Sequence, residues 1–439
     1  MCDTFVALGN STRDGSVLFA KNSDRDPNEA HALVMVPAAT HQPGEKVKCT
    51  YIEIPQVEKT FQVLLAKPFW IWGAEMGANE FGVTIGNEAL FTREPYQKEP
   101  GLIGMDFLRL ALERGKTAAG AMQVIIDLLE QYGQGGNCGY AHPFYYHNSY
   151  LICDRGEAWV LETVGREWAA EKVQDVRSIS NGITIQKKWD RASENLVQHA
   201  IDRGWCRDAA DFDFQACYSD PLYTRFAEAR YRQSCTTDQL CQAKGSLTAA
   251  DMMRILRTHR EPFHPGRGIV GADVCMHAGW GPIRTSQSAG SLVSVLPAQG
   301  EPVHWLTGTA APCTSVFKPV WMDAGLPESV RVPGAEYDEQ VLFWRHEALH
   351  REILKDYAAR IQPILRDRDA LEQSFITAAE ERPLTVARRQ EITRSCFARS
   401  AAQEETWLAE VRQIPVTHHN GVLYSSVWKK LNQQAHLPE

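Results

Sequence analysis

The sequence lacks the features that mark membrane-spanning, nucleotide-binding and secreted proteins. No apolar run approaches the roughly 20 residues that a helix needs to cross a bilayer, so we expect no membrane association. The glycine-rich stretches lack the Gly-Lys-Ser/Thr ending of a phosphate-binding loop. A net charge of −8, without a basic stripe, argues against nucleic acid as a partner. The N-terminal stretch has neither the basic nor the long apolar segment of a signal peptide, which predicts a cytoplasmic protein.

The eleven cysteines are scattered along the chain, and no two of them form a CxxC pair. An odd number without paired spacing argues against a disulfide framework or a cysteine-rich zinc site. The short runs Cys275-Met276-His277 and His418-His419 have no completing ligand set in the sequence. We therefore expect no metal and no cofactor, and we interpret most of the cysteines as small buried apolar residues.

The order of the expected elements predicts an α+β fold. Blocks of apolar runs separated by turn residues alternate with blocks of helical periodicity, which is typical of antiparallel sheets with helices on their faces. We expect strands within residues 4–86, 149–185 and 275–321, and helices within residues 104–132, 186–260 and 337–431. We predict one domain over residues 1–335 and a helical C-terminal extension over residues 336–439 that packs on or beside it.

The first 25 residues predict a β-hairpin that brings candidate catalytic residues together. An Asp-Gly turn separates two apolar runs, so the end of the second strand returns to the start of the first. Removal of Met1 would leave Cys2 with both a thiol and an α-amine, whose pKa of about 8 suits a proton acceptor. Asp24 could then orient the amine, and the charge of Lys21 could lower the thiol pKa. By itself, the same pattern also fits a chance cysteine and a charged turn.

A further candidate catalytic residue lies after the tryptophan-containing run at residues 70–82. A buried strand follows this run and ends in Asn87 and Glu88, and polar side chains at such a position need partners. The Asn87 amide is a candidate donor to a developing oxyanion. Trp70 and Trp72 are more typical of core packing than of a substrate-binding wall.

Several longer stretches resemble the secernins. They are the N-terminal segment and the runs WGAEMGANE (72–80), GQGGN (133–137), EAWVLET (157–163), WAAEK (168–172), LTGT (306–309) and SVFKP (315–319). The resemblance is strong to about residue 325 and weaker in the helical tail. Secernins belong to the C69 dipeptidase group of N-terminal nucleophile hydrolases, whose wider group includes penicillin V acylase and bile salt hydrolase. The resemblance implies a four-layer αββα sandwich, here with a C-terminal helical appendix.

The resemblance also implies roles for individual residues. Cys2 would be the N-terminal nucleophile, and Asp24 stands where the wider group has an aspartate near the amine. Lys21 takes the place of an arginine in the acylases, so the residue at this position affects the pKa of the thiol differently.

Three further residues follow from the same resemblance. Asn87 would match the side-chain donor to the oxyanion. Asn181 would match a second asparagine that contacts the amine of the nucleophile or the substrate. Arg225 resembles the later active-site arginine.

A competing motif lies in the helical tail. His346, Glu347 and His350 fit the HExxH pattern of zinc metallopeptidases, in which two histidines on one helix face hold the metal. No third ligand stands out nearby, and Leu342, Leu349 and Ile353 form an apolar packing stripe on the same segment. The sequence therefore favours a packing role for this helix.

Taken together, the residues predict an enzyme, namely a cysteine-dependent amide-bond hydrolase of the C69 type. Its expected partner is a small peptide, such as a dipeptide, or an N-acyl amino acid, and Met1 is expected to be removed from the mature chain. Two alternatives stay open, a non-catalytic regulatory or interaction protein on the same scaffold and a zinc peptidase. A homo-oligomer also remains open.

Overall fold

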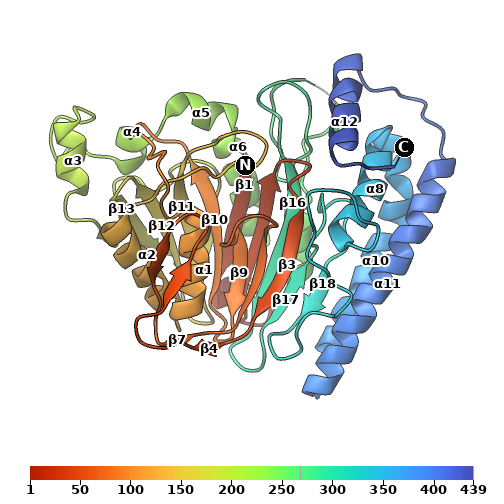
Figure 1. Ribbon diagram of the computed structural model, residues 1–439, viewed down its shortest axis with the longest axis horizontal. Helices are drawn as coiled ribbons and strands as arrows, with labels where there is room; N and C mark the ends of the chain where they lie inside the picture. Colours follow the sequence, from red (N-terminus) through yellow and green to blue (C-terminus); the bar gives the residue numbers. More distant parts are fainter. Residues whose placement is uncertain (267, 439) are drawn as a thin grey trace.

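The computed structural model describes residues 1–266 and 268–438, and its centre is a pair of antiparallel β-sheets (Figure 1). The first sheet has the strand order β14 (Val176–Ile179), β1 (Cys2–Ala7), β2 (Val17–Arg25), β16 (Gln287–Leu296), β17 (Val303–Leu306) and β18 (Lys318–Val320). The second sheet has the order β15 (Arg191–Ala192), β13 (Glu167–Lys172), β12 (Ala158–Val164), β11 (His147–Cys153), β10 (Thr84–Leu90), β9 (Met76–Asn79), β8 (Val63–Pro68) and β3 (His31–Val36).

Two small two-stranded sheets lie outside these large sheets. They pair β4 (Ala39–Thr40) with β7 (Lys59–Thr60) and β5 (Lys46–Lys48) with β6 (Glu53–Pro55).

The hairpin expected at the N-terminus is confirmed. β1 pairs antiparallel with β2 in a register that places Cys2 opposite Ser23. Because side chains alternate between the two faces of a strand, Val6 and Phe19 enter the apolar core between the sheets. Phe5 and Leu18 enter a second apolar core on the outer face. The hairpin thus lies at the middle of the sandwich and ends at Cys2.

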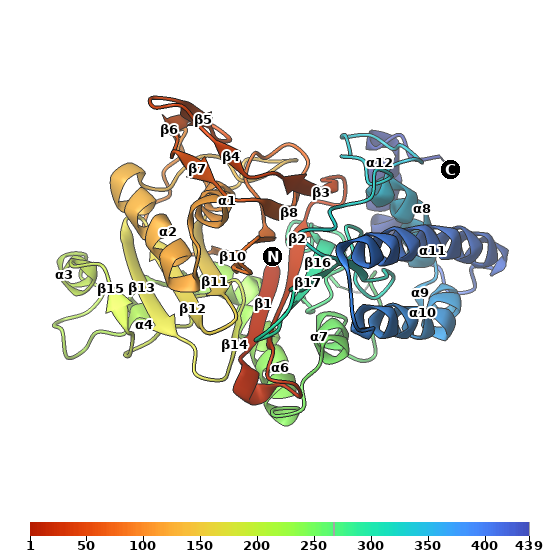
Figure 2. The ribbon, with the colours of Figure 1, turned by 90° about the horizontal axis from the view of Figure 1, so that it is seen from below.

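Helices cover the outer face of each sheet, so the predicted four-layer αββα arrangement is confirmed. On the second sheet lie α1 (Gly104–Arg114) and α2 (Ala118–Tyr132), which form an apolar cluster with its strands. The Thr117 side chain accepts a hydrogen bond from Gly120 and caps the start of α2, and Gly133 ends this helix at a φ of 70°. On the first sheet lie α6 (Ala229–Gln242) and α7 (Ala249–Leu256). Figure 2 shows α1 and α2 on one side of the sheets and α10 and α11 on the other.

Four further short helices lie in connections within the sandwich, one between β1 and β2 and three between β15 and α6. They are the 3-10 helix η1 (Gly9–Ser11), α3 (Leu196–Asp202), α4 (Phe214–Tyr218) and α5 (Pro221–Phe226).

The C-terminal helices extend the outer layer of the first sheet. They are α8 (Leu342–Leu354), α9 (Tyr357–Arg360), α10 (Gln362–Glu380), α11 (Val386–Gln413) and α12 (Val422–Gln434). Ile353, Phe375 and Trp407 of these helices share one apolar cluster with Phe5 and Trp305 of the sheet. The burial of these C-terminal helices therefore depends on the sheet. The domain boundary predicted at residue 335 stays a prediction.

Across residues 1–266 and 268–438, no helix combines the length and the apolar character that crossing a bilayer requires.

Candidate active site

A cavity of about 1000 Å³ opens beside the N-terminal end of β1. Its wall is built from the residues after β2, a loop before β11, the loop before β16, and helices α5 and α12. Met1, Cys2 and Asp24 line it together with Leu431 of the C-terminal helix α12. The cavity therefore joins the expected nucleophile to the C-terminal extension.

Cys2 is 5% exposed, and polar groups surround its sulfur and its backbone nitrogen. The backbone N–H of Asp24 donates to Sγ at 3.4 Å, and Sγ lies 3.8 Å from Oε2 of Glu75. The backbone N–H of Cys2 donates to Oδ1 of Asn181 at 2.8 Å. Burial raises the pKa of the thiol to about 12, against the opposing charge of Lys21. In this Met1-bearing chain the thiol is therefore protonated at neutral pH.

Asp24 lies at the end of β2, next to the residue that pairs with Cys2. Its Oδ1 accepts a hydrogen bond of 2.6 Å from Ser288 on β16, and its Oδ2 is buried with no hydrogen-bond partner within residues 1–266 and 268–438. Burial raises the pKa of this carboxyl to about 6, although the N-terminal ammonium and Arg232 oppose the shift. A buried carboxylate oxygen without a partner is suited to hold a cation such as an α-ammonium.

Lys21 is fully buried between the sheets. Its Nζ donates to the backbone oxygen of Asn87 at 2.7 Å and lies 3.5 Å from Oε1 of Glu88. Burial works against its charge, but negative charge on Cys2 and Glu88 in their ionised forms outweighs burial and raises the Lys21 pKa. Lys21 is therefore a fixed positive charge behind the nucleophile and is not part of the cavity wall.

Asn181 meets an arginine that the sequence analysis missed. Arg232 on α6 is fully buried, and its guanidinium donates to Oδ1 of Asn181 at 2.7 Å, to the backbone oxygen of Cys2 at 2.8 Å and to Asp3 at 2.7 Å. Arg225, the residue chosen from the sequence, is exposed on α5 and does not line the cavity. The available signal was the helix period, because Arg232 is the charged residue on the buried stripe of α6 (Ala229, Arg232, Thr236 and Leu240).

The side chain of Asn87 lies on the same face of β10 as Ala89, a residue of the cavity wall. Gly86 and Glu88 face Lys21 and Thr4 in the space between the sheets, so alternation turns Asn87 to the outer face of β10. There its Nδ2 lies 3.3 Å from Oδ1 of Asn148 and 3.5 Å from the sulfur of Met105 on α1. These contacts engage the Asn87 amide in this Met1-bearing chain, and its role as the oxyanion donor stays a prediction.

Glu75, in the motif before β9, reaches the site instead. Its Oε1 accepts from Arg25 at 3.2 Å, and Arg25 also forms a two-pronged ion pair with Glu29 at 2.6 and 2.9 Å. Trp70 is half-buried and donates its indole N–H to Glu29 at 2.7 Å. The tryptophan-containing run therefore supports the cavity wall through hydrogen bonds as well as by packing.

The HExxH residues do not form a catalytic zinc site. His346 interacts with Glu404 at 3.0 Å and with Thr314 at 3.2 Å, whereas Glu347 pairs with Arg351 at 2.6 Å. His350 points to a different histidine, at 3.4 Å. Within the described chain, neither histidine of the motif belongs to a group of three or more metal-ligand side chains. The spacing of His346 and His350 is therefore that of two residues on the packed face of helix α8.

Comparison with known proteins assigns the chain to a family. The family model described as peptidase family C69 matches residues 1–364. The chain belongs to peptidase family C69. This confirms the C69 group expected from the sequence motifs, and the match extends across the sandwich into the first C-terminal helices.

Named relatives of this C69 chain include two dipeptidases. A protein called "Probable dipeptidase" from Salmonella dublin is 26% identical over 242 residues, which cover 50% of this chain and 53% of that protein. A protein called "Dipeptidase" from Bifidobacterium longum is 29% identical over 201 residues, which cover 40% of this chain and 35% of that protein. The alignments thus span about half or less of these relatives.

Among solved structures, penicillin V acylase from Agrobacterium tumefaciens is 13% identical to this C69 chain. The superposition covers 73% of this chain and 86% of the acylase, with a TM-score of 0.44.

Proposed function

We propose that the protein is an amide-bond hydrolase in which Cys2, freed from Met1, is the nucleophile. The observation that carries the proposal is the position of Cys2 at the wall of the cavity, between a buried lysine and the buried Asp24 carboxylate, one oxygen of which has no hydrogen-bond partner among the described residues. Membership of peptidase family C69 supports hydrolysis of a peptide-type bond. Neither the position of Cys2 nor the family membership depends on the HExxH motif.

Removal of Met1 changes the chemistry of Cys2. While Met1 is attached, the Cys2 nitrogen is an amide that donates to Asn181 and cannot accept a proton. Once freed, the same nitrogen is an amine with an ordinary pKa of about 8. Oδ1 of Asn181 remains in place to accept from it, and Oδ2 of Asp24 provides a negative charge nearby. The Met1 ammonium, which donates to the backbone oxygen of Asp24 at 3.2 Å, leaves this wall of the cavity.

The reaction then follows two steps. The amine takes the Sγ proton, the sulfur forms a bond to the substrate carbonyl carbon, and the protonated amine returns the proton to the departing nitrogen as the amide bond breaks. The second step is hydrolysis of the resulting thioester, in which the amine takes a proton from water and the hydroxide adds to the carbonyl. Expulsion of the thiolate releases the acid product. The Asp24 N–H, which already points at Sγ, stabilises the thiolate in both steps.

The charges of the cavity favour a dipeptide over an N-acyl amino acid. Acidic residues outnumber basic ones on its wall, and the guanidinium of Arg25 on that wall is already paired with Glu29 and Glu75. The acidic residues are Asp24, Asp26, Glu29, Glu75 and Glu336, and the basic residues are Arg25, Arg284 and Lys430. This balance attracts the free ammonium of a dipeptide, a group that an N-acyl amino acid lacks.

The test is hydrolysis of a dipeptide panel and an N-acyl amino acid panel by protein whose intact mass shows that Met1 is absent. We expect turnover of dipeptides that is lost in Cys2→Ala and after thiol alkylation. Cys217→Ala, at a buried cysteine of the inter-sheet core, is the matched control and should retain activity. No turnover by verified Met1-free protein would favour a non-catalytic role on the same scaffold.

A further inference from the structure

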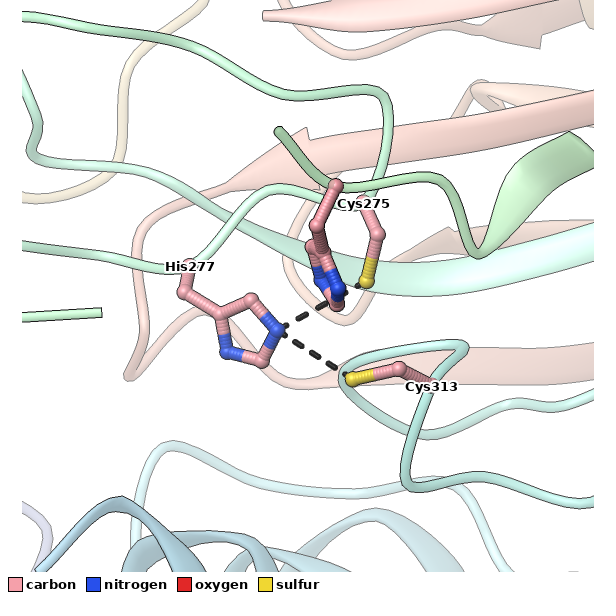
Figure 3. A group of neighbouring side chains, drawn as sticks. Cys275, His277 and Cys313 are labelled. Carbon is pink, nitrogen blue, oxygen red and sulfur yellow. Dashed lines mark hydrogen bonds between the residues drawn. The ribbon is translucent and has the colours of Figure 1, made fainter. Parts of the chain in front are cut away.

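We propose that the chain holds a structural zinc ion at His259, Cys275, His277 and Cys313. One ligand atom from each of these four side chains lies within 4.8 Å of the other three. They come from the segment after α7 and from the loop between β17 and β18, so the fold joins ligands that are far apart in the sequence. Figure 3 shows the His277 ring directed between the sulfurs of Cys275 and Cys313. The proposal is independent of the hydrolase mechanism.

The spacing of these atoms fits a tetrahedral zinc site. With Zn–S bonds of about 2.3 Å and Zn–N bonds of about 2.0–2.1 Å, tetrahedral geometry separates sulfur and nitrogen ligands by roughly 3.6 Å. Nε2 of His277 lies 3.6 Å from the sulfur of Cys275 and 3.2 Å from the sulfur of Cys313. Two thiolates and two imidazoles form one of the common closed ligand sets of structural zinc.

The burial of the cluster also favours a metal. Cys275, His277 and Cys313 are buried, and Nε2 of His259 is buried without a hydrogen-bond partner within residues 1–266 and 268–438. Two thiolates balance the charge of a divalent cation, so the loaded site would be neutral in this apolar surrounding.

A second layer of polar groups orients the ligands as it does in known zinc sites. Nδ1 of His277 lies 3.4 Å from Nε2 of His350, whose Nδ1 lies 3.3 Å from Oε1 of Glu347. The Tyr357 hydroxyl donates to the sulfur of Cys313 at 3.4 Å. A metal-bound histidine usually passes its second N–H to such a chain, which fixes its ring orientation. The helix that carries the HExxH motif thus supports the proposed site from outside and supplies none of its four ligands.

The proposed site also lies directly behind Asp24. Met276, between two of the ligands, accepts a backbone hydrogen bond of 2.9 Å from the Ser288 N–H, and its own N–H donates to the Ser288 hydroxyl at 3.0 Å. The same hydroxyl donates to Asp24 at 2.6 Å. Ala278, next to His277, lines the cavity. A zinc ion would therefore fix the wall of the cavity and the partner of Asp24 without touching the substrate.

The first experiment measures metals in the purified full-length protein by plasma mass spectrometry. We expect about one zinc per chain in the wild type and in Cys396→Ser, a control at a buried cysteine of α11, and below about 0.1 in Cys313→Ser. Zinc content unchanged in Cys313→Ser would overturn the proposal. So would metal-free wild type that takes up no added zinc, or a mass lower by two hydrogens that maps to a Cys275–Cys313 disulfide.

Two further measurements keep the test decisive if Cys313→Ser fails to fold. Cobalt added to zinc-stripped wild type should give thiolate-to-cobalt charge-transfer bands and the absorption of a tetrahedral ion. His350→Gln should weaken zinc binding about 10–100-fold in competition with a chelator, because it removes the partner of His277. His419→Gln, at an exposed histidine, should leave the affinity unchanged. An octahedral cobalt spectrum without thiolate bands, or equal zinc affinity in the two histidine variants, would contradict the proposed ligand arrangement.

Discussion

Asp24→Asn should separate catalysis from stability in this protein. The substitution keeps the size of the side chain and the oxygen that accepts from Ser288 at 2.6 Å. It removes the negative charge, which is buried and has one oxygen without a partner in the described part of the chain. We therefore expect a more stable protein that has lost most of its activity.

The pH dependence gives the size of the stability effect. The pKa of Asp24 is raised from 3.8 to about 6, because burial disfavours the charged form. Between these values the folded chain binds the proton more tightly than the unfolded chain does, so the free energy of unfolding falls as the pH rises from about 4 to about 6. At pH 7 this cost is about 3 kcal/mol, from about 1.4 kcal/mol for each pH unit. Asp24→Asn should recover about 1–3 kcal/mol at pH 7 and nothing below about pH 4.

Urea unfolding from pH 4 to pH 8 measures the difference in the free energy of unfolding between wild type and Asp24→Asn. This experiment uses protein that retains Met1, the form that the structure describes. Dipeptide turnover by Met1-free protein measures the effect on catalysis. We expect kcat of Asp24→Asn to fall roughly 10²-fold, because the Asp24 carboxylate no longer holds the Cys2 amine. Asp238→Asn, at an exposed position on α6, is the control and should change neither quantity. A stability difference that is equal at pH 4 and pH 7 would refute the electrostatic argument. Loss of stability at pH 7 with normal kinetics would make Asp24 a structural residue.

Three other predictions test the surroundings of the nucleophile. Protein verified by intact mass to retain Met1 should show no turnover, because the Cys2 nitrogen is then not basic; full activity in such a sample would defeat the mechanism. Arg232→Met should lower the free energy of unfolding by about 3–5 kcal/mol, because Asp3 loses its buried partner, and adding Asp3→Asn should restore part of it. Strictly additive losses in urea unfolding would contradict that pairing. Asn181→Ala should lower kcat roughly 10²-fold with a smaller change in KM, and a change confined to KM would assign Asn181 to substrate binding alone.

Local patterns in the sequence predicted the parts of the fold that depend on near neighbours. The Asp-Gly turn and the alternation of Val6, Phe19 and Phe5 specify a hairpin with two apolar faces, and this places Cys2 beside Asp24 with no help from the rest of the chain. The periodicity of residues 104–132, with Thr117 as a cap and Gly133 at the end, specifies α1 and α2.

Strand alternation also shows why the sequence alone does not orient Asn87. A period of two residues puts Asn87 on the face opposite Gly86 and Glu88, but it does not say which face of β10 meets the other sheet. Only the packing of Gly86 against Lys21, and of Asn87 against Met105, decides this. The position of Asn87 at the strand end therefore does not by itself decide which groups its amide meets, and its role as an oxyanion donor stays a prediction.

The sequence by itself determined the layered α+β fold, the N-terminal hairpin and the membership of family C69, because these follow from short-range periodicity and from long motifs. Only the tertiary structure brought Arg232, Ser288 and Glu75 to Cys2, since each comes from a different element and the order of strands in the sheets decides which elements meet. The same holds for the proposed zinc ligands, whose pairing of Cys275 with Cys313 depends on loops that meet only after β16 and β17 lie side by side. The period of one element shows which of its residues are buried, as for Arg232 on α6, but the partners across such sequence distances are fixed by the burial of whole elements against one another.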